Sequence, residues 1–290
     1  MTFSRPLSLV AVIAASSALA ACGSSDGTSS SKSSSASASP KPAACTKGSL
    51  ATQTKGQLTV ATDKPAYPPY FEDNKPANGK GFESAVAYAI ADKLGFAQAD
   101  VKWTVVPFNS SYAPGPKKFD FDVNQISITD ARKKRVDFSS PYFTAPQAVV
   151  ALNGTGAAKA TSLGELQSAK LGVQVGTTSL DAVQNVIKPS NDPQVFNDSN
   201  DTVRALKTKR VDAVVVDLPT AFYLTGAQID NSKIVGQFNA PGGDAWGALL
   251  QKGSKLTACV SKAVDELKAD GTLSKLQNQW MGGDSAPQLH

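Results

Sequence analysis

The side chains that could carry chemistry in this sequence are carboxylates and arginines rather than histidines. The chain of 290 residues holds one histidine, His290, at its last position. A histidine-based catalytic centre or metal site is therefore not expected, and we expect neither a metal ion nor another cofactor. Charge recognition or acid–base work then falls to residues such as Asp63, Glu83, Arg132 and Asp217.

Two of these residues each allow two interpretations from their local sequence. Arg132 opens the run Arg132-Lys-Lys-Arg135, and such a run is usually a solvated face. Asp217 ends the apolar segment 211–217, and the ends of strands in α/β sheets are where ligands bind. Asp217 also stands two residues before Pro219, where it could instead cap a helix.

Strand and helix patterns alternate from residue 58 onward, which places these residues on an α/β scaffold. Strands are predicted at 58–62, 101–106, 122–127, 171–175 and 211–217. Helical spacing of apolar residues predicts a helix ending before Gly95, a short one around Val203 and Leu206, one ending at Gly271, and a last one reaching Trp280. The strand at 211–217 is apolar enough for burial on both faces, so we expect parallel sheets.

The N-terminus predicts export. Residues 1–21 carry Arg5 and then a short uncharged run typical of a secretory signal peptide. The run ends in Leu19-Ala-Ala-Cys22, which resembles the bacterial lipobox. We therefore expect a lipoprotein signal peptide, a lipidated Cys22 and stable anchoring through its acyl chains. The alternative is an ordinary signal peptide with an incidental cysteine.

Residues 22–44 are nearly all Ser, Ala, Gly, Lys and Pro, a composition that predicts a disordered tether. The formal charge of +5 and pI of about 9.0 lean basic, but lysines and acids are interspersed. That pattern favours a solvated mixed surface, and we expect no nucleic-acid partner.

Two cysteines remain after Cys22. Cys45 and Cys259 would meet in an oxidising or disulfide-permissive compartment, so we expect them to pair. Such a disulfide would join the start of the folded part to a C-terminal helix. The alternative is two separate buried thiols.

Several segments, taken in order, resemble the amino-acid-binding proteins of ABC importers, in the polar-amino-acid branch (family 3 of the bacterial extracellular solute-binding proteins). They span about residues 57 to 281, and Ile126-Ser-Ile-Thr-Asp-Ala-Arg132 with Val136-Asp-Phe-Ser-Ser-Pro-Tyr142 is the most specific stretch. The others are Leu58-Thr-Val-Ala-Thr-Asp63, Tyr67-Pro-Pro-Tyr-Phe71, Gly79-Lys-Gly-Phe82, Gln174-Val-Gly-Thr-Thr178, Arg210-Val-Asp-Ala-Val-Val-Val-Asp217, Lys252-Gly-Ser, and Asp270-Gly-Thr-Leu to Trp280.

The resemblance implies a type II periplasmic-binding-protein fold: two α/β lobes joined by two crossover strands, with the ligand in the cleft between them. On this division, residues 45–147 and 243–290 form lobe 1, and residues 148–242 form lobe 2.

The resemblance also assigns the main ligand contacts. Arg132 would bind the ligand carboxylate through its planar fork, and Asp217 would bind the ammonium. Ser127 and Thr178 would add hydrogen bonds together with the backbone amides of Gln125 and Gly176. The alternative for these hydroxyls is ordinary turn and cap bonding.

The side-chain end of the ligand is less defined. Tyr67 and Phe71 would form an aromatic wall, with core packing as the alternative. Asp63 could pair with a cationic ligand side chain or brace the turn before Pro65. The loop 109–118 and the helix start Glu83-Ser84 depart from the family pattern, so the identity of the ligand stays open.

The resemblance implies a protein that is not an enzyme. It would be a monomer anchored to the outer face of the cytoplasmic membrane, which closes its lobes on a free, polar amino acid and docks on an ABC permease. Two alternatives stay open: a dehydratase-like enzyme using Glu83 or Asp63 as acid or base, and a ligand-sensing module without transport.

Overall fold

A computed structural model describes residues 45–240, 244–282 and 285–290 of the chain. The predicted signal peptide at 1–21, the lipidation site Cys22 and the tether up to residue 44 lie outside the described residues. The positions 241–243 and 283–284 lie outside them as well.

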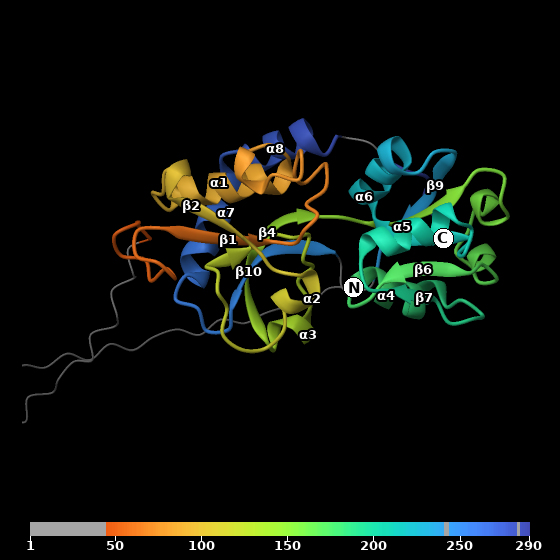
Figure 1. Cartoon of the computed structure of the whole chain (residues 1–290), viewed down its shortest axis with the longest axis horizontal. Helices are drawn as coiled ribbons and strands as arrows, with labels where there is room; N and C mark the ends of the chain where they lie inside the picture. The colour runs from red at the N-terminus through yellow and green to blue at the C-terminus, as the bar shows by residue number, and fades with distance from the viewer. Residues whose placement is uncertain (1–44, 241–243, 283–284) are drawn as a thin grey trace, which may run out of the picture. The chain divides into compact units, whose positions relative to one another are not determined.

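The described chain is built on two five-stranded sheets with flanking helices (Figure 1). The first sheet has the order β2-β1-β3-β10-β4, and we call the part built on it lobe 1. Its strands are β1 (Leu58–Thr62), β2 (Val101–Val105), β3 (Phe121–Asp122), β4 (Val136–Thr144) and β10 (Ala245–Gln251). Strands β1, β2 and β3 are parallel, while β10 is antiparallel to both of its neighbours.

The second sheet repeats this plan with the order β7-β6-β8-β5-β9, and we call the part built on it lobe 2. Its strands are β5 (Gln147–Leu152), β6 (Leu171–Gln174), β7 (Gln194–Phe196), β8 (Ala213–Asp217) and β9 (Ser232–Phe238). Here β6, β7 and β8 are parallel, and β5 is antiparallel to β8 and β9.

The predicted parallel sheets are therefore mixed sheets. Strands β5 and β10 each follow a segment that joins the two sheets, residues 145–146 after β4 and residues 239–244 after β9. Each of them lies between a parallel strand and an edge strand, antiparallel to both. The apolar β8 is central as expected, but only one of its two neighbours is parallel.

Helices α1 (Phe82–Lys93), α7 (Thr257–Ala269) and α8 (Thr272–Trp280) contact one another beside the first sheet (Figure 1). Apolar residues at helical spacing, such as Val86, Ile90, Val260 and Val264, are fully buried there. In lobe 2, α4 (Thr178–Ala182), α5 (Ser199–Lys207) and α6 (Leu218–Tyr223) pack against β8. The short helices α2 (Phe108–Ser111) and α3 (Asp130–Lys133) complete the set that positions the site.

The strand expected at 122–127 ends early. Only Phe121–Asp122 pairs as β3, and Ser127 returns to the sheet as an isolated bridge to Trp246. Between them Gln125 has φ of 48°, a left-handed conformation that a β-strand cannot contain. This left-handed residue ends the strand, so residues 124–126 do not continue the pairing of β3 with β1 and β10.

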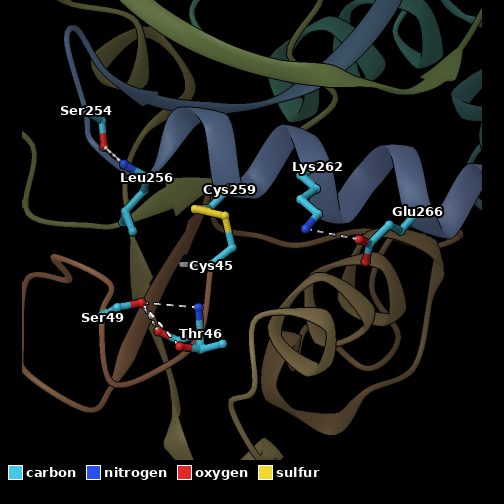
Figure 2. Close-up of a disulfide and its surroundings, with 8 residues drawn as sticks. All are labelled: Cys45, Thr46, Ser49, Ser254, Leu256, Cys259, Lys262 and Glu266. Atoms are coloured by element: carbon cyan, nitrogen blue, oxygen red, sulfur yellow. Dashed lines mark hydrogen bonds and ion pairs between the residues drawn. A yellow bond between two sulfur atoms is a disulfide. The ribbon is translucent and has the colours of Figure 1, made fainter. Parts of the chain in front are cut away.

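Cys45 and Cys259 form a disulfide with a Cα–Cα distance of 5.3 Å, which confirms the predicted pairing. Figure 2 shows that Cys259 extends from α7 toward the first described residues of the chain. The bond spans 214 residues and ties both ends of lobe 1 together. In the same segment Lys47 bonds Asp100 at 2.6 Å.

The end of the chain departs from the division predicted for the lobes. Met281 packs against the core of lobe 1, but Leu289 is buried in the core of lobe 2. Gln288 bridges to Gln237 in parallel, so the tail extends the open edge of the second sheet at β9. The backbone of Gln237 donates to Pro287 and accepts from Leu289, at 2.7 and 2.8 Å.

Gly236 shows how closely the tail lies on β9. A Cβ atom at this position would be 2.6 Å from Leu289 Cγ and 2.7 Å from the Pro287 carbonyl oxygen. No periodic pattern in the sequence indicated this contact, because a single buried leucine beside an open strand edge has no pattern of its own. Across the residues that the structure describes, no helix is long and apolar enough to cross a membrane.

Replacing Leu289 by Ala is expected to destabilise the protein by about 2 to 4 kcal/mol, since a buried leucine leaves a cavity when truncated. Urea unfolding followed by circular dichroism measures the change. Val195→Ala is the control, because Val195 is 46% exposed on β7 of the same sheet and should cost below about 0.5 kcal/mol. Equal midpoints for L289A and the unmodified protein would show that the tail is not a part of the folded sheet.

Candidate functional site

Arg132 is held inside the protein by the first turn of α3. Thr129 precedes this helix, and its side chain accepts a hydrogen bond from the Arg132 backbone N–H at 3.2 Å. The Arg132 side chain is 7% exposed. Its Nη1 donates to the Ser127 carbonyl at 2.7 Å, and its Nη2 donates to the Gly176 carbonyl of lobe 2 at 2.9 Å.

Two aromatic rings cover the guanidinium. Its Cζ lies 4.7 Å from the ring centre of Tyr112 and 5.5 Å from that of Phe108, within the range of cation–π attraction. Tyr112 Oη also donates to the Gly176 carbonyl at 3.2 Å. Gly176 has φ of 72°, and a Cβ there would lie 2.2 Å from Tyr112 Oη, so this position requires glycine.

Arg132 thus bonds neutral carbonyl oxygens, and among the described residues it forms no ion pair. Burial lowers the pKa of the guanidinium, yet an arginine keeps its proton at neutral pH. A buried cation without a carboxylate partner is costly. The geometry therefore leaves a strong preference for an anion at Arg132.

Asp217 ends β8 and stands at the N-cap position of α6, but its side chain makes no capping bond. Its Oδ1 instead accepts a hydrogen bond from Gln147 Nε2 at 2.6 Å. Burial, reinforced by the nearby Asp244, raises the pKa of Asp217 to about 7. The capping interpretation of Asp217 is therefore wrong. A cation beside this buried acid would stabilise its ionised form.

Asp244 is an acid that sequence reasoning missed. It is 2% exposed, and neither of its carboxylate oxygens has a hydrogen-bond partner among the described residues. Burial raises its pKa. The only available signal was its position just before the apolar segment that forms β10.

One cavity of about 140 Å³ brings the predicted residues together. Residues of both lobes line it, including Arg132 from the first and Asp217 from the second. Of the predicted contacts, all but Gly176 belong to its lining: Asp63, Tyr67, Phe71, Gln125, Ser127, Arg132, Thr178 and Asp217. Gly176 takes part through its carbonyl, which binds Arg132.

Hydrogen bonds between the lobes surround this cavity. Ser127 Oγ lies 3.2 Å from Thr178 Oγ1, and Tyr70 Oη lies 2.8 Å from Thr220 Oγ1. Tyr67 Oη bonds the Asn200 side chain. These bonds describe a conformation in which the two lobes are in contact around the site.

Phe71 and Asp63 serve the scaffold as well as the cavity. Phe71 is 1% exposed and packs edge-on against Trp103 with ring centres 5.8 Å apart, as its core interpretation predicted. The carboxylate of Asp63 accepts from the backbone N–H of Lys64 at 2.6 Å and of Phe108 at 3.1 Å. It therefore braces the turn before Pro65, while still lining the cavity.

Glu83 fixes the wall at Gln125. It is fully buried, and its Oε1 accepts from the Gln125 backbone N–H at 2.7 Å. It also bonds the Gln125 side chain and Tyr142 Oη. Burial raises its pKa to about 7. The Gln125 amide expected to face a ligand is thus bonded to Glu83, and Glu83 is not a lining residue of the cavity.

A second cavity of about 50 Å³ adjoins the first and shares seven of its lining residues. None of the described residues that line it is an Asp, Glu, Lys or Arg. Its polar groups are amides and hydroxyls: Tyr67, Tyr70, Gln125, Ser199, Asn200, Thr220, Tyr223 and Gln228.

Two proteins of similar sequence are named as binding proteins. The L-cystine-binding protein TcyJ of Escherichia coli K12 is 30% identical over 233 residues, covering 79% of this chain and 84% of that protein. The arginine-binding extracellular protein ArtP of Bacillus subtilis is 26% identical over 246 residues, covering 83% and 92%.

Solved structures agree. An ancestral arginine-binding protein bound to glutamine is 35% identical with a TM-score of 0.65, covering 79% of this chain and 99% of that one. The ancestral amino acid-binding protein AncCDT-1, described as a precursor of cyclohexadienyl dehydratase, is 31% identical with a TM-score of 0.64, covering 78% and 95%. The fold is therefore the type II periplasmic-binding-protein fold that the sequence predicted.

The family model of the bacterial extracellular solute-binding proteins, family 3, matches residues 58–283. This range includes both sheets and every residue of the cavity lining. With these sheets, this cavity between two lobes and these relatives, the chain belongs to the bacterial extracellular solute-binding proteins of family 3.

Proposed function

We propose that this protein is the solute-binding component of an ABC importer and captures a free amino acid with a polar side chain between its lobes. The observation that carries the proposal is the pair of charges at the cavity. Arg132 is a buried cation without an ion pair, and Asp217 is an acid whose pKa is raised by burial. Among the described residues neither forms an ion pair, and a free amino acid would supply a carboxylate to Arg132 and an ammonium to Asp217.

A zwitterionic amino acid supplies both charges from one carbon. Its carboxylate would bind Arg132 in two parallel charge-assisted hydrogen bonds, which is the geometry that the guanidinium fork favours. Its ammonium would bind Asp217. Ser127 and Thr178 face the same cavity from opposite lobes and would add hydrogen bonds. Gly176 would act by holding Arg132 rather than by contacting the ligand.

The surroundings favour an uncharged polar side chain. The second cavity offers amides and hydroxyls, and no charged Asp, Glu, Lys or Arg lines it. The main cavity is also lined by Lys64 and Asp198. Both oxygens of its Asp63 already accept backbone N–H groups, and Asp198 Oδ1 accepts from the Asp201 backbone N–H. Named relatives bind cystine, arginine or histidine, and one solved relative holds glutamine, so the scaffold accepts polar ligands of several kinds.

The transport context is part of the proposal. We propose that Cys22 is lipidated, that the tether holds the folded part at the outer face of the cytoplasmic membrane, and that the protein works as a monomer on an ABC permease. Binding rather than catalysis is supported by the named relatives and by Glu83, whose oxygens bond Gln125 and Tyr142 instead of facing the cavity.

A panel of the twenty amino acids in a thermal-shift assay tests the proposal. Uncharged polar amino acids should raise the melting temperature, and a ligand at about 100 times its Kd should stabilise by roughly 2.7 kcal/mol. Aspartate and glutamate should give no shift. A flat response over the whole panel would show that the site does not bind free amino acids, and product analysis of each mixture would reveal turnover.

Replacing Arg132 by Ala should weaken binding at least about 100-fold, because truncating one partner of a buried charge pair removes its hydrogen bonds and its charge. Lys at this position keeps the charge but loses the fork, so R132K should stay well below the unmodified protein. Isothermal titration calorimetry measures both. Arg135→Ala is the matched control, since Arg135 is an exposed cation of the same run. If R132A bound the ligand with unchanged affinity, the assignment of Arg132 to the ligand carboxylate would be wrong.

Affinity should fall as pH falls through neutrality. Asp217 has a pKa of about 7 in the ligand-free protein, and only its ionised form accepts from an ammonium. Ligand binding therefore lowers this pKa and releases a proton below pH 7. Between about pH 7.5 and pH 5.5 the affinity should drop roughly 10- to 25-fold. Calorimetry in buffers of different ionisation enthalpy detects the proton, and a pH-independent affinity would contradict the assignment of Asp217.

A further inference from the structure

Gln147 occupies the point where the chain enters lobe 2. It is the first residue of β5 and directly follows the connecting residues 145–146. In the sheet it lies between Asp217 on β8 and Phe238 on β9. Its side chain is 0% exposed although it is a primary amide. A buried amide needs a partner at each end, because an unmade hydrogen bond in the interior is costly.

Both ends of this amide are bonded to elements of the site. Its Nε2 donates to Asp217 Oδ1 at 2.6 Å, and its Oε1 accepts from Ser179 Oγ at 2.6 Å. Ser179 lies in the first turn of α4 and, like Thr178, lines the cavity. One side chain therefore connects the end of β8 to the start of α4.

The backbone at the same place supports the side chain. The Pro146 carbonyl accepts from the Leu218 N–H at 2.9 Å, so the residue after Asp217 is also attached to the connecting segment. Asp217 is held twice, once through its main-chain neighbour and once through its carboxylate. The carboxylate keeps further acceptor capacity for a ligand.

The charges around Asp217 explain why a donor is needed there. Asp244 and Glu83 raise the pKa of Asp217, whereas Arg132 and the hydrogen bond from Gln147 lower it. Gln147 is thus the neutral group that favours the ionised form of Asp217 from within lobe 2. An apolar residue of the same size would fill the space but would not donate a hydrogen bond. Burial, Asp244 and Glu83 would then raise the pKa of Asp217 further.

We propose that Gln147 is a positioning residue for ligand binding, which orients the Asp217 carboxylate toward the cavity, favours its ionised form and fixes it to the start of α4. The inference rests on the proposed function, since it assumes that Asp217 receives an ammonium group. Gln147 itself is not a lining residue of the cavity, so it acts through Asp217 and Ser179.

The direct experiment follows the titration of Asp217 in the ligand-free protein. Aspartate labelled with ¹³C at the carboxyl carbon is observed by NMR from about pH 5 to pH 9, and the signal missing in D217N identifies Asp217. Gln147→Met keeps the approximate volume and removes both hydrogen bonds. In Q147M the Asp217 signal should titrate at higher pH than in the unmodified protein.

Two control variants separate this role from general packing. Ser179→Ala removes the bond at the other end of the amide and leaves the one to Asp217. Gln237→Met removes an amide of the same sheet whose Nε2 donates to the Ala286 carbonyl at 3.0 Å. Neither should move the titration of Asp217. Urea unfolding of each variant reports whether its fold is intact.

Binding measurements then test the consequence. The ligand is the amino acid that gives the largest thermal shift in the panel. Q147M should bind it roughly tenfold to hundredfold more weakly than the unmodified protein at pH 7.5, as expected for losing a hydrogen bond to a charged group. The loss should grow toward pH 6, because the variant needs a higher pH to ionise Asp217. A purely structural role would instead lower affinity by the same factor at every pH.

The outcomes are distinguishable. If Asp217 titrates at the same pH in Q147M as in the unmodified protein, Gln147 does not act on it and the inference is wrong. If no amino acid binds the unmodified protein, the proposed function fails, while the NMR titration still decides whether Gln147 controls Asp217. Should Q147M be unfolded, Gln147→Leu, which also removes both hydrogen bonds, carries the same comparison.

Discussion

The site depends on one buried charge that the protein itself leaves unneutralised. Arg132 lies under two aromatic rings and bonds the carbonyls of Ser127 and Gly176, one from each lobe. Each carbonyl accepts one of the five guanidinium N–H groups and neither balances the net charge, so an anion gains more here than at an exposed arginine. Three features position this guanidinium: the Gly176 carbonyl bonds it, the Tyr112 ring covers it, and the turn at 129–132 holds its backbone.

The opposite charge lies on the other lobe, so under the proposed function one small ligand would contact both lobes at once. Bonds such as Ser127–Thr178, Tyr70–Thr220 and Arg132–Gly176 connect the lobes around the cavity, and each involves at least one neutral group. Such bonds contribute little net stability each, because open lobes would bond water instead. The proposed zwitterion between Arg132 and Asp217 would add contacts that exist only when the lobes meet.

Much of the site could be predicted because it lies in local motifs. The local sequence left Arg132 and Asp217 open to other interpretations, and the resemblance of their segments to a known family assigned their roles. Eight predicted contacts do line one cavity. Gln147 and Asp244 belong to no motif that could be recognised in the sequence. Each stands at or directly before the start of an apolar strand, and its neighbours in space are known only once β5, β8 and β10 are placed. The strand predicted at 122–127 was wrong beyond Asp122, since a left-handed Gln125 is invisible in an alternating pattern. The tail at Leu289 was missed for a similar reason.

The buried acids also constrain how the ligand-free protein responds to pH. Glu83, Asp122 and Asp217 each have a pKa of about 7, raised mainly by burial above the value of an unfolded chain. Between about pH 4.5 and pH 7 the native state therefore binds more protons than the unfolded state, and its stability declines as pH rises. A ligand ammonium at Asp217 opposes this trend by stabilising one of the ionised acids. Because the pKa of Asp217 is raised, binding of an ammonium there would require loss of its proton below about pH 7, so capture of such a ligand would be coupled to deprotonation of this acid.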